Sequence, residues 1–240
     1  MTSRQVAVLA GGRATRLGAL AEQLPKVLQP VGGRPFLDVL LSGLGRRGCR
    51  RVHLCLGHLA ERVEEHLRVR PGHAVAVSTS TESGAAGTAG ALVGAADHLD
   101  EVFAVVMGDT YLEFDVADLV RQLPPGALGL MLVTRAATEV PANVAVRDGL
   151  VTAYDKHGVR GGLTDTGVAV LRKEALRLVA HRPLPADLAE LFGLLIDRGQ
   201  LAATVVDCRF FDIGTPERIQ VLNDWLSDAA TETSQEQASC

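Results

Sequence analysis

The sequence predicts an α/β protein in which helices cover both faces of a mainly parallel, mixed central sheet, a Rossmann-like three-layer arrangement. Short apolar runs rich in β-branched residues alternate with longer segments of helical periodicity, which is the pattern of βαβ units. Two of the runs, Gln5–Ala10 and Val102–Met107, are apolar almost throughout, as is typical of parallel strands buried on both faces. The chain has 240 residues, 47% apolar and 22% charged, enough for one domain with its own core.

The first half of the chain supports this arrangement element by element. The strand Gln5–Ala10 stops at two glycines. Along 35–44 the apolar side chains fall on one helical face, and Gly45 followed by two arginines ends that helix. The elements predicted next are a strand at Arg51–Leu56, a helix at 59–68, a strand at 73–78, a helix at 88–98 and a strand at Val102–Met107.

The second half is less regular. An Asp-Gly turn at 148–149 joins two strands into a hairpin that we expect to border the sheet. The predicted strands are 127–134, 143–146, Leu150–Tyr154, 166–171 and Leu201–Val206. Two helices around 173–180 and 186–197 and a closing helix over 216–226 complete a single domain over 1–226. Residues 227–240 lack apolar periodicity, which predicts a frayed, disordered tail.

Charge and hydropathy exclude several classes of function. The formal net charge is −4, whereas nucleic-acid-binding proteins usually carry an excess of basic residues. No apolar segment reaches the roughly 18 residues that a membrane span needs, and the first apolar run is too short for a signal peptide. The four cysteines form no CxxC pair and no zinc-like spacing. We expect a cytoplasmic protein without nucleic-acid or membrane partners, and the sequence leaves open whether it forms a homo-oligomer.

A glycine-rich loop, LAGGRATRLG, follows the first strand. Glycines let backbone N–H groups approach a phosphate closely, and Arg13, Arg16 and Lys26 add positive charge nearby. The loop is neither a Walker motif, because no Gly-Lys-Ser/Thr follows, nor a dinucleotide-binding fingerprint, because its third glycine is misplaced. A Gly-Gly pair alone is more often a plain strand-to-helix turn; with three cations it predicts a phosphate-binding loop.

Two separated aspartates are candidate metal ligands. Asp109 follows the apolar strand Val102–Met107, and the carboxyl ends of such strands are where open α/β sheets bind ligands. Asp212 lies in FFDIGTP, where Thr215 and Pro216 already supply the cap and first position of a helix. Asp109 taken alone could instead serve merely to satisfy a turn, whereas Asp212 is not needed as the helix cap. Together they match the way Mg²⁺ is held, by a few carboxylates and substrate phosphates.

Four motifs in order resemble a known family, the sugar-1-phosphate nucleotidyltransferases, also called nucleoside-diphosphate-sugar pyrophosphorylases. They are LAGGRATRLG, LPK at 24–26, GDT at 108–110 and FDIGTP at 211–216, and they extend over nearly the whole chain. GTAGAL at 87–92, GDTYLEFD at 108–115 and FDIGTPE at 211–217 are similar to the subgroup acting on D-glycero-D-manno-heptose 1-phosphate, usually with GTP. The resemblance implies Mg²⁺-assisted in-line attack of a sugar 1-phosphate on the α-phosphate of a nucleoside triphosphate, releasing pyrophosphate.

The resemblance also implies roles for individual residues. The catalytic set is Arg16, Lys26, Asp109 and Asp212, and both aspartates bind the metal. The nucleotide-binding set is Leu9, Ala10, Gly11, Gly12, Arg13, Glu82, Gly87 and Thr88. The set that binds the sugar phosphate is Thr110, Asp155, Lys156, Asp165 and Gly167.

The chain departs from the family pattern at a few positions. Ala14 replaces the usual loop glycine, and Asp165 stands where the heptose subgroup usually has Asn. Alternatives therefore remain: the same reaction with ATP or another triphosphate and a hexose or cyclitol phosphate, or a nucleotide-sensing subunit without activity. A glycosyltransferase of related fold would carry an Asp-x-Asp pair, whereas GDTYLEFD has Asp109 without a second aspartate two residues on.

Overall fold

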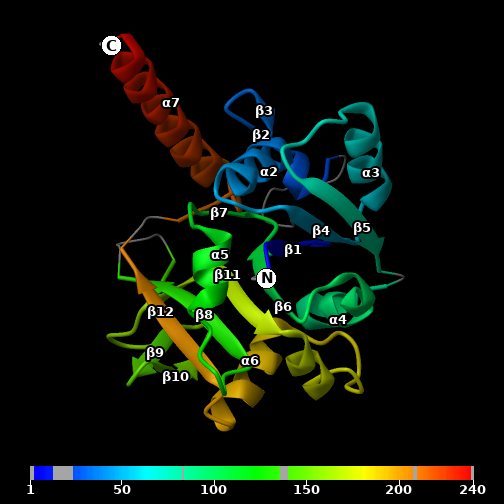
Figure 1. Ribbon diagram of the computed structural model, residues 1–240, viewed down its shortest axis with the longest axis vertical. Coiled ribbons are helices and arrows are strands. Elements are labelled where there is room, and N and C mark those ends of the chain that lie inside the picture. The colour runs from blue at the N-terminus through cyan, green and yellow to red at the C-terminus, as the bar shows by residue number, and fades with distance from the viewer. Residues whose placement is uncertain (1–2, 13–23, 83, 136–139, 208–209, 239–240) are drawn as a thin grey trace.

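A computed structural model describes residues 3–12, 24–82, 84–135, 140–207 and 210–238 (Figure 1). Its centre is a nine-stranded sheet of order β5-β4-β1-β6-β11-β8-β12-β10-β9. The strands are β1 Gln5–Ala10, β4 Arg51–Leu56, β5 Ala76–Thr81, β6 Val102–Met107, β8 Gly129–Thr134, β9 Val144–Arg147, β10 Leu150–Tyr154, β11 Thr164–Arg172 and β12 Leu201–Val206. Only β11 and β10 run antiparallel to both of their neighbours, so the other strands share one direction and the sheet is mixed but largely parallel.

Helices cover both faces of this sheet, which confirms the predicted three layers. The α-helices are α2 Phe36–Arg46, α3 Ala60–Val69, α4 Gly87–Gly94, α5 Val116–Arg121, α6 Leu188–Asp197 and α7 Pro216–Ala238. Short 3₁₀ segments are η2 Lys26–Leu28, η3 Ala96–His98 and η4 Lys173–Leu178. In β1, Val6 and Val8 belong to the core shared with α2, α3 and α5, while Ala7 and Leu9 belong to the core shared with α4 and α6. Successive side chains of a strand point to opposite faces of the sheet, so β1 contributes to both cores.

Two pairs of very short strands lie outside the main sheet. β2, Pro30–Val31, pairs with β3, Arg34–Pro35, just before α2. β7, Thr110–Tyr111, pairs antiparallel with β13, Phe211–Asp212, although about a hundred residues separate them in sequence. The second pair ties the chain after β6 to the chain before α7, and it therefore fixes the two candidate metal ligands relative to each other.

The predicted hairpin is confirmed at the edge of the sheet. β9 and β10 are antiparallel neighbours there, and the turn between them has a positive φ at Asp148 (51°) and Gly149 (76°). Two consecutive positive φ angles are the mark of a type I′ turn, whose twist matches that of the flanking strands. The Asp-Gly pair was therefore a sufficient local signal.

The closing helix is longer than predicted. The sequence predicts a helix ending at Leu226, whereas α7 continues to Ala238 and extends away from the sheet in Figure 1. Residues 227–238 contain no Gly or Pro, and Ala, Glu and Gln are good helix formers, so the helix continues where apolar periodicity has ended. Among the described residues no helix is long and apolar enough to cross a membrane.

Candidate active site

A cavity of about 680 Å³ opens at the carboxyl ends of β1, β4, β5 and β6. Gly11 and Gly12 follow β1, Gly57 follows β4, Glu82 follows β5, and Asp109 follows β6. The carboxyl edge is where open α/β sheets bind ligands, because the loops there diverge from neighbouring strands. Of the predicted residues, those that line the cavity are Leu9, Ala10, Gly11, Gly12, Lys26, Glu82, Gly87, Thr88 and Asp109.

Glycines bring the strand ends close enough to form this cavity. A Cβ at Gly108 would lie 2.5 Å from the carbonyl oxygen of Leu9, and one at Gly57 would lie 2.5 Å from Oε1 of Glu82. A side chain at either position would therefore force neighbouring atoms to move, including the backbone at Gly108. The Glu82 carboxylate is held there, since its Oε2 accepts a hydrogen bond from the backbone N–H of Ala86 at 3.0 Å.

Lys26 and Asp109 meet at one end of the cavity. The Lys26 ammonium lies 2.5 Å from Oδ2 of Asp109, and both side chains are mostly buried. Lys26 begins η2, and the next two residues, Val27 and Leu28, are buried in the core, which anchors the lysine stem. The pair joins positions 83 residues apart, so no local pattern in the sequence reveals it.

Asp212 lies beside this pair. The backbone N–H of Ile213 donates to the carbonyl of Asp109 at 2.9 Å, which aligns the two segments. A Cβ at Gly214 would lie 2.6 Å from Oδ1 of Asp212 and 3.7 Å from Nζ of Lys26, so the lysine and both aspartates gather around one glycine. The predicted catalytic residues Lys26, Asp109 and Asp212 are therefore brought together.

Arg218 is a contact of Asp212 that the sequence analysis missed. Its Nη1 donates to Oδ2 and Oδ1 of Asp212 at 2.8 and 3.0 Å, and Oδ1 also accepts the backbone N–H of Gly214 at 2.9 Å. Arg218 lies in the first turn of α7, where a cation opposes the helix dipole. A cation at this unfavourable position indicates that a nearby anion compensates for it, and this was the one hint in the sequence that Arg218 has an acidic partner.

The two carboxylates fit a divalent cation of the Mg²⁺ kind. Asp109, just before β7, and Asp212, in β13, offer hard oxygen donors, and both side chains are partly exposed, 25% and 16% respectively. Within the described ranges no group of three or more His, Cys, Asp or Glu side chains could hold a metal. Two carboxylates completed by phosphate and water oxygens is the arrangement that Mg²⁺ favours over an all-protein cage.

A second group of predicted residues lies beside the cavity rather than in its wall. Gly167 has φ +75°, and a Cβ there would lie 2.7 Å from Oγ1 of Thr110 and 3.2 Å from Cγ of Met107, a cavity residue. The N–H of Gly167 donates to Oδ1 of Asp165 at 2.9 Å. Burial raises the pKa of Asp165 to about 6, against the lowering effect of the Gly167 and Tyr154 hydrogen bonds.

Lys156 reaches the cavity through Asp187. Its ammonium lies 3.6 Å from Oδ2 of Asp187, which lines the cavity, while Asp155 accepts a hydrogen bond from the N–H of His157 in the adjoining turn. Asp187 also accepts from Oγ1 of Thr88 at 3.4 Å. The sequence analysis missed Asp187. An Asp three residues before a Glu indicates the start of a helix, but this pattern does not show that the aspartate faces the cavity.

The remaining residues of the cavity add little chemistry. Burial raises the pKa of the Cys55 thiol to about 12, so this cavity residue stays protonated and is a poor nucleophile. His53, outside the cavity wall, is fully buried, and Ser78 and Ser80 both hydrogen-bond its ring, so its role is structural. Arg13 and Arg16 lie outside the described residues.

The fold and cavity define a protein of the nucleotide-binding α/β class: glycines at strand ends, Lys26 and Asp109 line a space of nucleotide size, and Asp212 lies beside it. Residues 5–159 match the model of the nucleotidyl transferase family, described as "Nucleotidyl transferase". The chain belongs to this family, and it is a sugar-1-phosphate nucleotidyltransferase, an enzyme of the EC 2.7.7 type.

The names of similar proteins point to several different substrates. The chain is 24% identical over 213 residues to a D-glycero-alpha-D-manno-heptose 1-phosphate guanylyltransferase of Campylobacter jejuni, covering 89% of this chain and 96% of that one. It is 25% identical to a UTP–glucose-1-phosphate uridylyltransferase of Synechocystis, covering 92% of this chain but only 63% of that longer protein. The crystal structure of HddC from Yersinia pseudotuberculosis, also solved with GMP-PN, superposes with a TM-score of 0.77 at 24% identity, covering 92% and 99% of the two chains. That likeness supports the fold.

Proposed function

We propose that the enzyme transfers a nucleotidyl group from GTP to a heptose-like sugar 1-phosphate and releases pyrophosphate. The observation that carries this proposal is the convergence of Lys26, Asp109 and Asp212 at one end of a cavity of nucleotide size. An ammonium there meets phosphate oxygens, and two carboxylates bind a divalent cation. A nucleotide-sensing subunit that had lost catalysis would have no need to retain all three.

The reaction needs no side-chain nucleophile. An oxygen of the sugar phosphate attacks the α-phosphorus in line, the bond from that phosphorus to the oxygen bridging the β-phosphate breaks, and pyrophosphate leaves. The backbone N–H groups of Gly11 and Gly12 and the Lys26 ammonium bind triphosphate oxygens, and Lys156 binds the acceptor phosphate. We assign Arg13 and Arg16 to the triphosphate as well. Positioning and charge neutralisation are the sources of the rate enhancement.

Asp109 and Asp212 would hold Mg²⁺ together with phosphate and water oxygens. The bound ion supplies positive charge at the phosphate where negative charge develops. The chain prepares both carboxylates for this role with cations of its own: Lys26 contacts Asp109, and Arg218 with the Gly214 N–H orients Asp212. Hydrogen-bonded partners of this kind fix the direction of a ligating carboxylate.

Glu82 supports the choice of guanine. Its Oε2 is bonded to the Ala86 N–H, while Oε1 faces Gly11 and Gly57 at the wall of the cavity. Guanine presents N1–H and the N2 amino group side by side, two donors that a carboxylate accepts; adenine and uracil lack this pair. Glu82→Gln should lower the preference for GTP over ATP at least tenfold in kcat/KM. An unchanged preference would remove Glu82 from base recognition.

The acceptor side of the site comprises Thr110, Asp155, Lys156, Asp165 and Gly167. Lys156 is balanced by Asp187, so its ammonium is already directed to the edge of the cavity. Asp165 prefers hydroxyl or cationic partners, which suits a polyhydroxylated acceptor. A hexose or cyclitol phosphate presents the same phosphate, so the acceptor class is the open part of the proposal.

The experiment is a matrix of the four nucleoside triphosphates against sugar 1-phosphates, with released pyrophosphate as the readout and Mg²⁺ present. GTP with D-glycero-D-manno-heptose 1-phosphate is expected to give the highest kcat/KM. A higher value for another pair would keep the reaction and change its substrates. Pyrophosphate release from no pair, by protein that is folded and binds GTP, would favour the nucleotide-sensing alternative.

A further inference from the structure

A second cavity, of about 930 Å³, lies at the amino ends of the parallel strands, opposite the catalytic cavity. Its walls come from the residues that start β1, β4 and β6, namely Ser3–Arg4, Arg50–Arg51 and 100–102, and from α5. The parallel strands run from this edge to the catalytic cavity at their carboxyl ends. The two cavities are therefore separated by the length of the buried strands, and no residue that the structure describes lines both.

The charge of the second cavity is positive. Four arginines line it, against two carboxylates, in a chain whose formal net charge is −4. The arginines are Arg4, Arg50, Arg51 and Arg121, and the carboxylates are Asp100 and Glu101. Clustered guanidinium groups repel one another, so their gathering around one concave surface of an acidic protein points to an anion.

Both carboxylates already have cationic partners. Asp100 accepts two hydrogen bonds from Nη2 of Arg51, at 2.6 and 2.7 Å, and one from Oγ of Ser3 at 2.7 Å. Glu101 pairs with Lys173 at 3.1 Å. Each carboxylate of the cavity therefore already lies beside an opposite charge.

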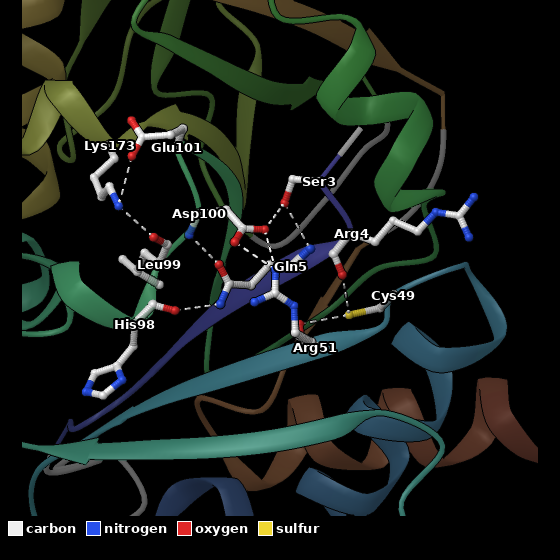
Figure 2. A network of polar contacts seen from close by, with 10 residues as sticks. All are labelled: Ser3, Arg4, Gln5, Cys49, Arg51, His98, Leu99, Asp100, Glu101 and Lys173. Atoms are coloured by element: carbon white, nitrogen blue, oxygen red, sulfur yellow. Dashed lines mark hydrogen bonds and ion pairs between the residues drawn. The ribbon is translucent and has the colours of Figure 1, made fainter. Parts of the chain in front are cut away.

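Arg4 and Arg50 are the cations that remain. Neither guanidinium has an ion-pair or hydrogen-bond partner among the described residues, and both side chains are exposed. In Figure 2 the Arg4 guanidinium points away from the network around Asp100, whereas the Arg51 guanidinium points into it. Arg121, by contrast, is paired with Asp118. Two five-donor groups on the lining of this cavity therefore have no acceptor within the described part of the chain.

The floor beneath them is rigid. The buried Gln5 side chain donates to the carbonyl of His98 at 2.8 Å and accepts from the N–H of Asp100 at 2.7 Å. The carbonyl of Arg4 accepts the N–H groups of Arg50 and Arg51 at 2.9 and 3.3 Å, which holds the backbones carrying the two arginines side by side. Figure 2 shows the contacts of Gln5, Arg51 and Asp100, which connect the chain at the starts of β1, β4 and β6. Preorganised backbones reduce the entropy lost when an anion is bound.

The other wall is apolar, formed by Val102, Ala117 and Val120. We propose that this cavity is a second ligand site for a small phosphorylated molecule, whose phosphate binds Arg4 and Arg50 and whose carbon skeleton lies on the apolar wall. Guanidinium groups match phosphate oxygens with paired N–H donors, a geometry that a single ammonium cannot provide. The site is independent of the catalytic phosphate groups described above.

The test is calorimetric titration with inorganic phosphate and with ribose 5-phosphate, in the Lys26→Gln background, which weakens phosphate binding at the catalytic cavity. Adding Arg4→Gln and Arg50→Gln should weaken binding of both probes at least tenfold. The matched control adds Arg62→Gln and Arg177→Gln, two exposed arginines outside both cavities, and should leave binding within twofold. Ribose 5-phosphate should bind at least threefold tighter than phosphate, because only it reaches the apolar wall.

Three outcomes would overturn the proposal. They are the absence of saturable binding in the Lys26→Gln protein, equal weakening by the control pair, and unchanged affinity after loss of Arg4 and Arg50. Equal affinity for the two probes would overturn the assignment of the carbon skeleton to the apolar wall. The four residues to be substituted are exposed arginines, so circular dichroism should report the same fold for every variant. The fluorescence of Trp225 gives a second check of folding.

Discussion

Asp165 should make the protein less stable as the pH rises. Burial raises the pKa of this carboxyl from 3.8 to about 6, so the folded state binds a proton more tightly than the unfolded chain does. The free energy of unfolding should therefore decrease between about pH 4 and pH 6 and be level above pH 6, as far as this group is concerned. A shift of about 2 pKa units corresponds to a cost of up to about 3 kcal/mol at pH 7.

Asp165→Asn removes the charge and keeps an oxygen for the Gly167 N–H, which Oδ1 of Asp165 now accepts at 2.9 Å. The variant should be more stable than the parent at pH 7, by 1–3 kcal/mol as an order of magnitude, and the two should converge near pH 4. Urea unfolding followed by fluorescence of Trp225, the single tryptophan, which packs on Phe211, measures this directly.

Asp197→Asn is the matched control, because that carboxylate is exposed near the end of α6. It should leave the pH profile of stability unchanged. The reasoning is refuted if the parent protein shows no loss of stability between pH 4 and pH 6, or if Asp165→Asn is destabilising at pH 7. The second result would mean that the ionised carboxylate makes contacts that outweigh its burial.

Further predictions concern the catalytic cavity. Asp109→Asn should lower kcat more than tenfold at saturating Mg²⁺, and a fall below threefold, less than roughly 1 kcal/mol, would contradict a metal role. Lys156→Ala should raise KM for the sugar phosphate; a rise confined to KM for the nucleotide would assign the lysine elsewhere. Arg218→Gln should weaken Mn²⁺ binding, measured by electron paramagnetic resonance, roughly tenfold, while unchanged affinity would leave the arginine a purely structural role. Gly108→Ala should lower stability in urea by about 1–3 kcal/mol, since its Cβ would lie 2.5 Å from the Leu9 carbonyl; a neutral effect would contradict the close approach of those strands.

Much of the site could be predicted because its residues follow strands. Gly11 and Asp109 come within two residues of the ends of predicted parallel strands, and the carboxyl ends of parallel strands meet at one edge of the sheet. Glu82 was predicted from the family resemblance instead, since the strand expected before it ended at residue 78. The order of the motifs then supplied the family, which residues 5–159 confirm. The roles of individual residues, and the choice of GTP and a heptose phosphate, stay predictions.

Other parts of the site could not be predicted from local pattern. Arg218 meets Asp212 because the first turn of α7 faces back over β13, and a helix start in the sequence carries no information about that direction. Asp187 was recognisable only as a helix cap, yet it faces Lys156 and Thr88. The continuation of α7 to Ala238 likewise depends on backbone propensity in a segment without apolar periodicity.

The sequence by itself determined most strands of the main sheet, the turn at Asp148 and Gly149, and the glycines at the strand ends, because these depend on interactions within a few residues. β5 lies three residues later than the predicted strand at 73–78, and the four short strands outside the main sheet were not predicted. Only the tertiary structure decided which charges meet. The Lys26–Asp109 pair spans 83 residues, and Arg51–Asp100 spans 49. Among the residues that the structure describes, the same long-range packing left the guanidinium groups of Arg4 and Arg50 without an ion-pair or hydrogen-bond partner at the amino ends of the parallel strands. Side-chain charge is local information, whereas its neutralisation is decided by the folded backbone.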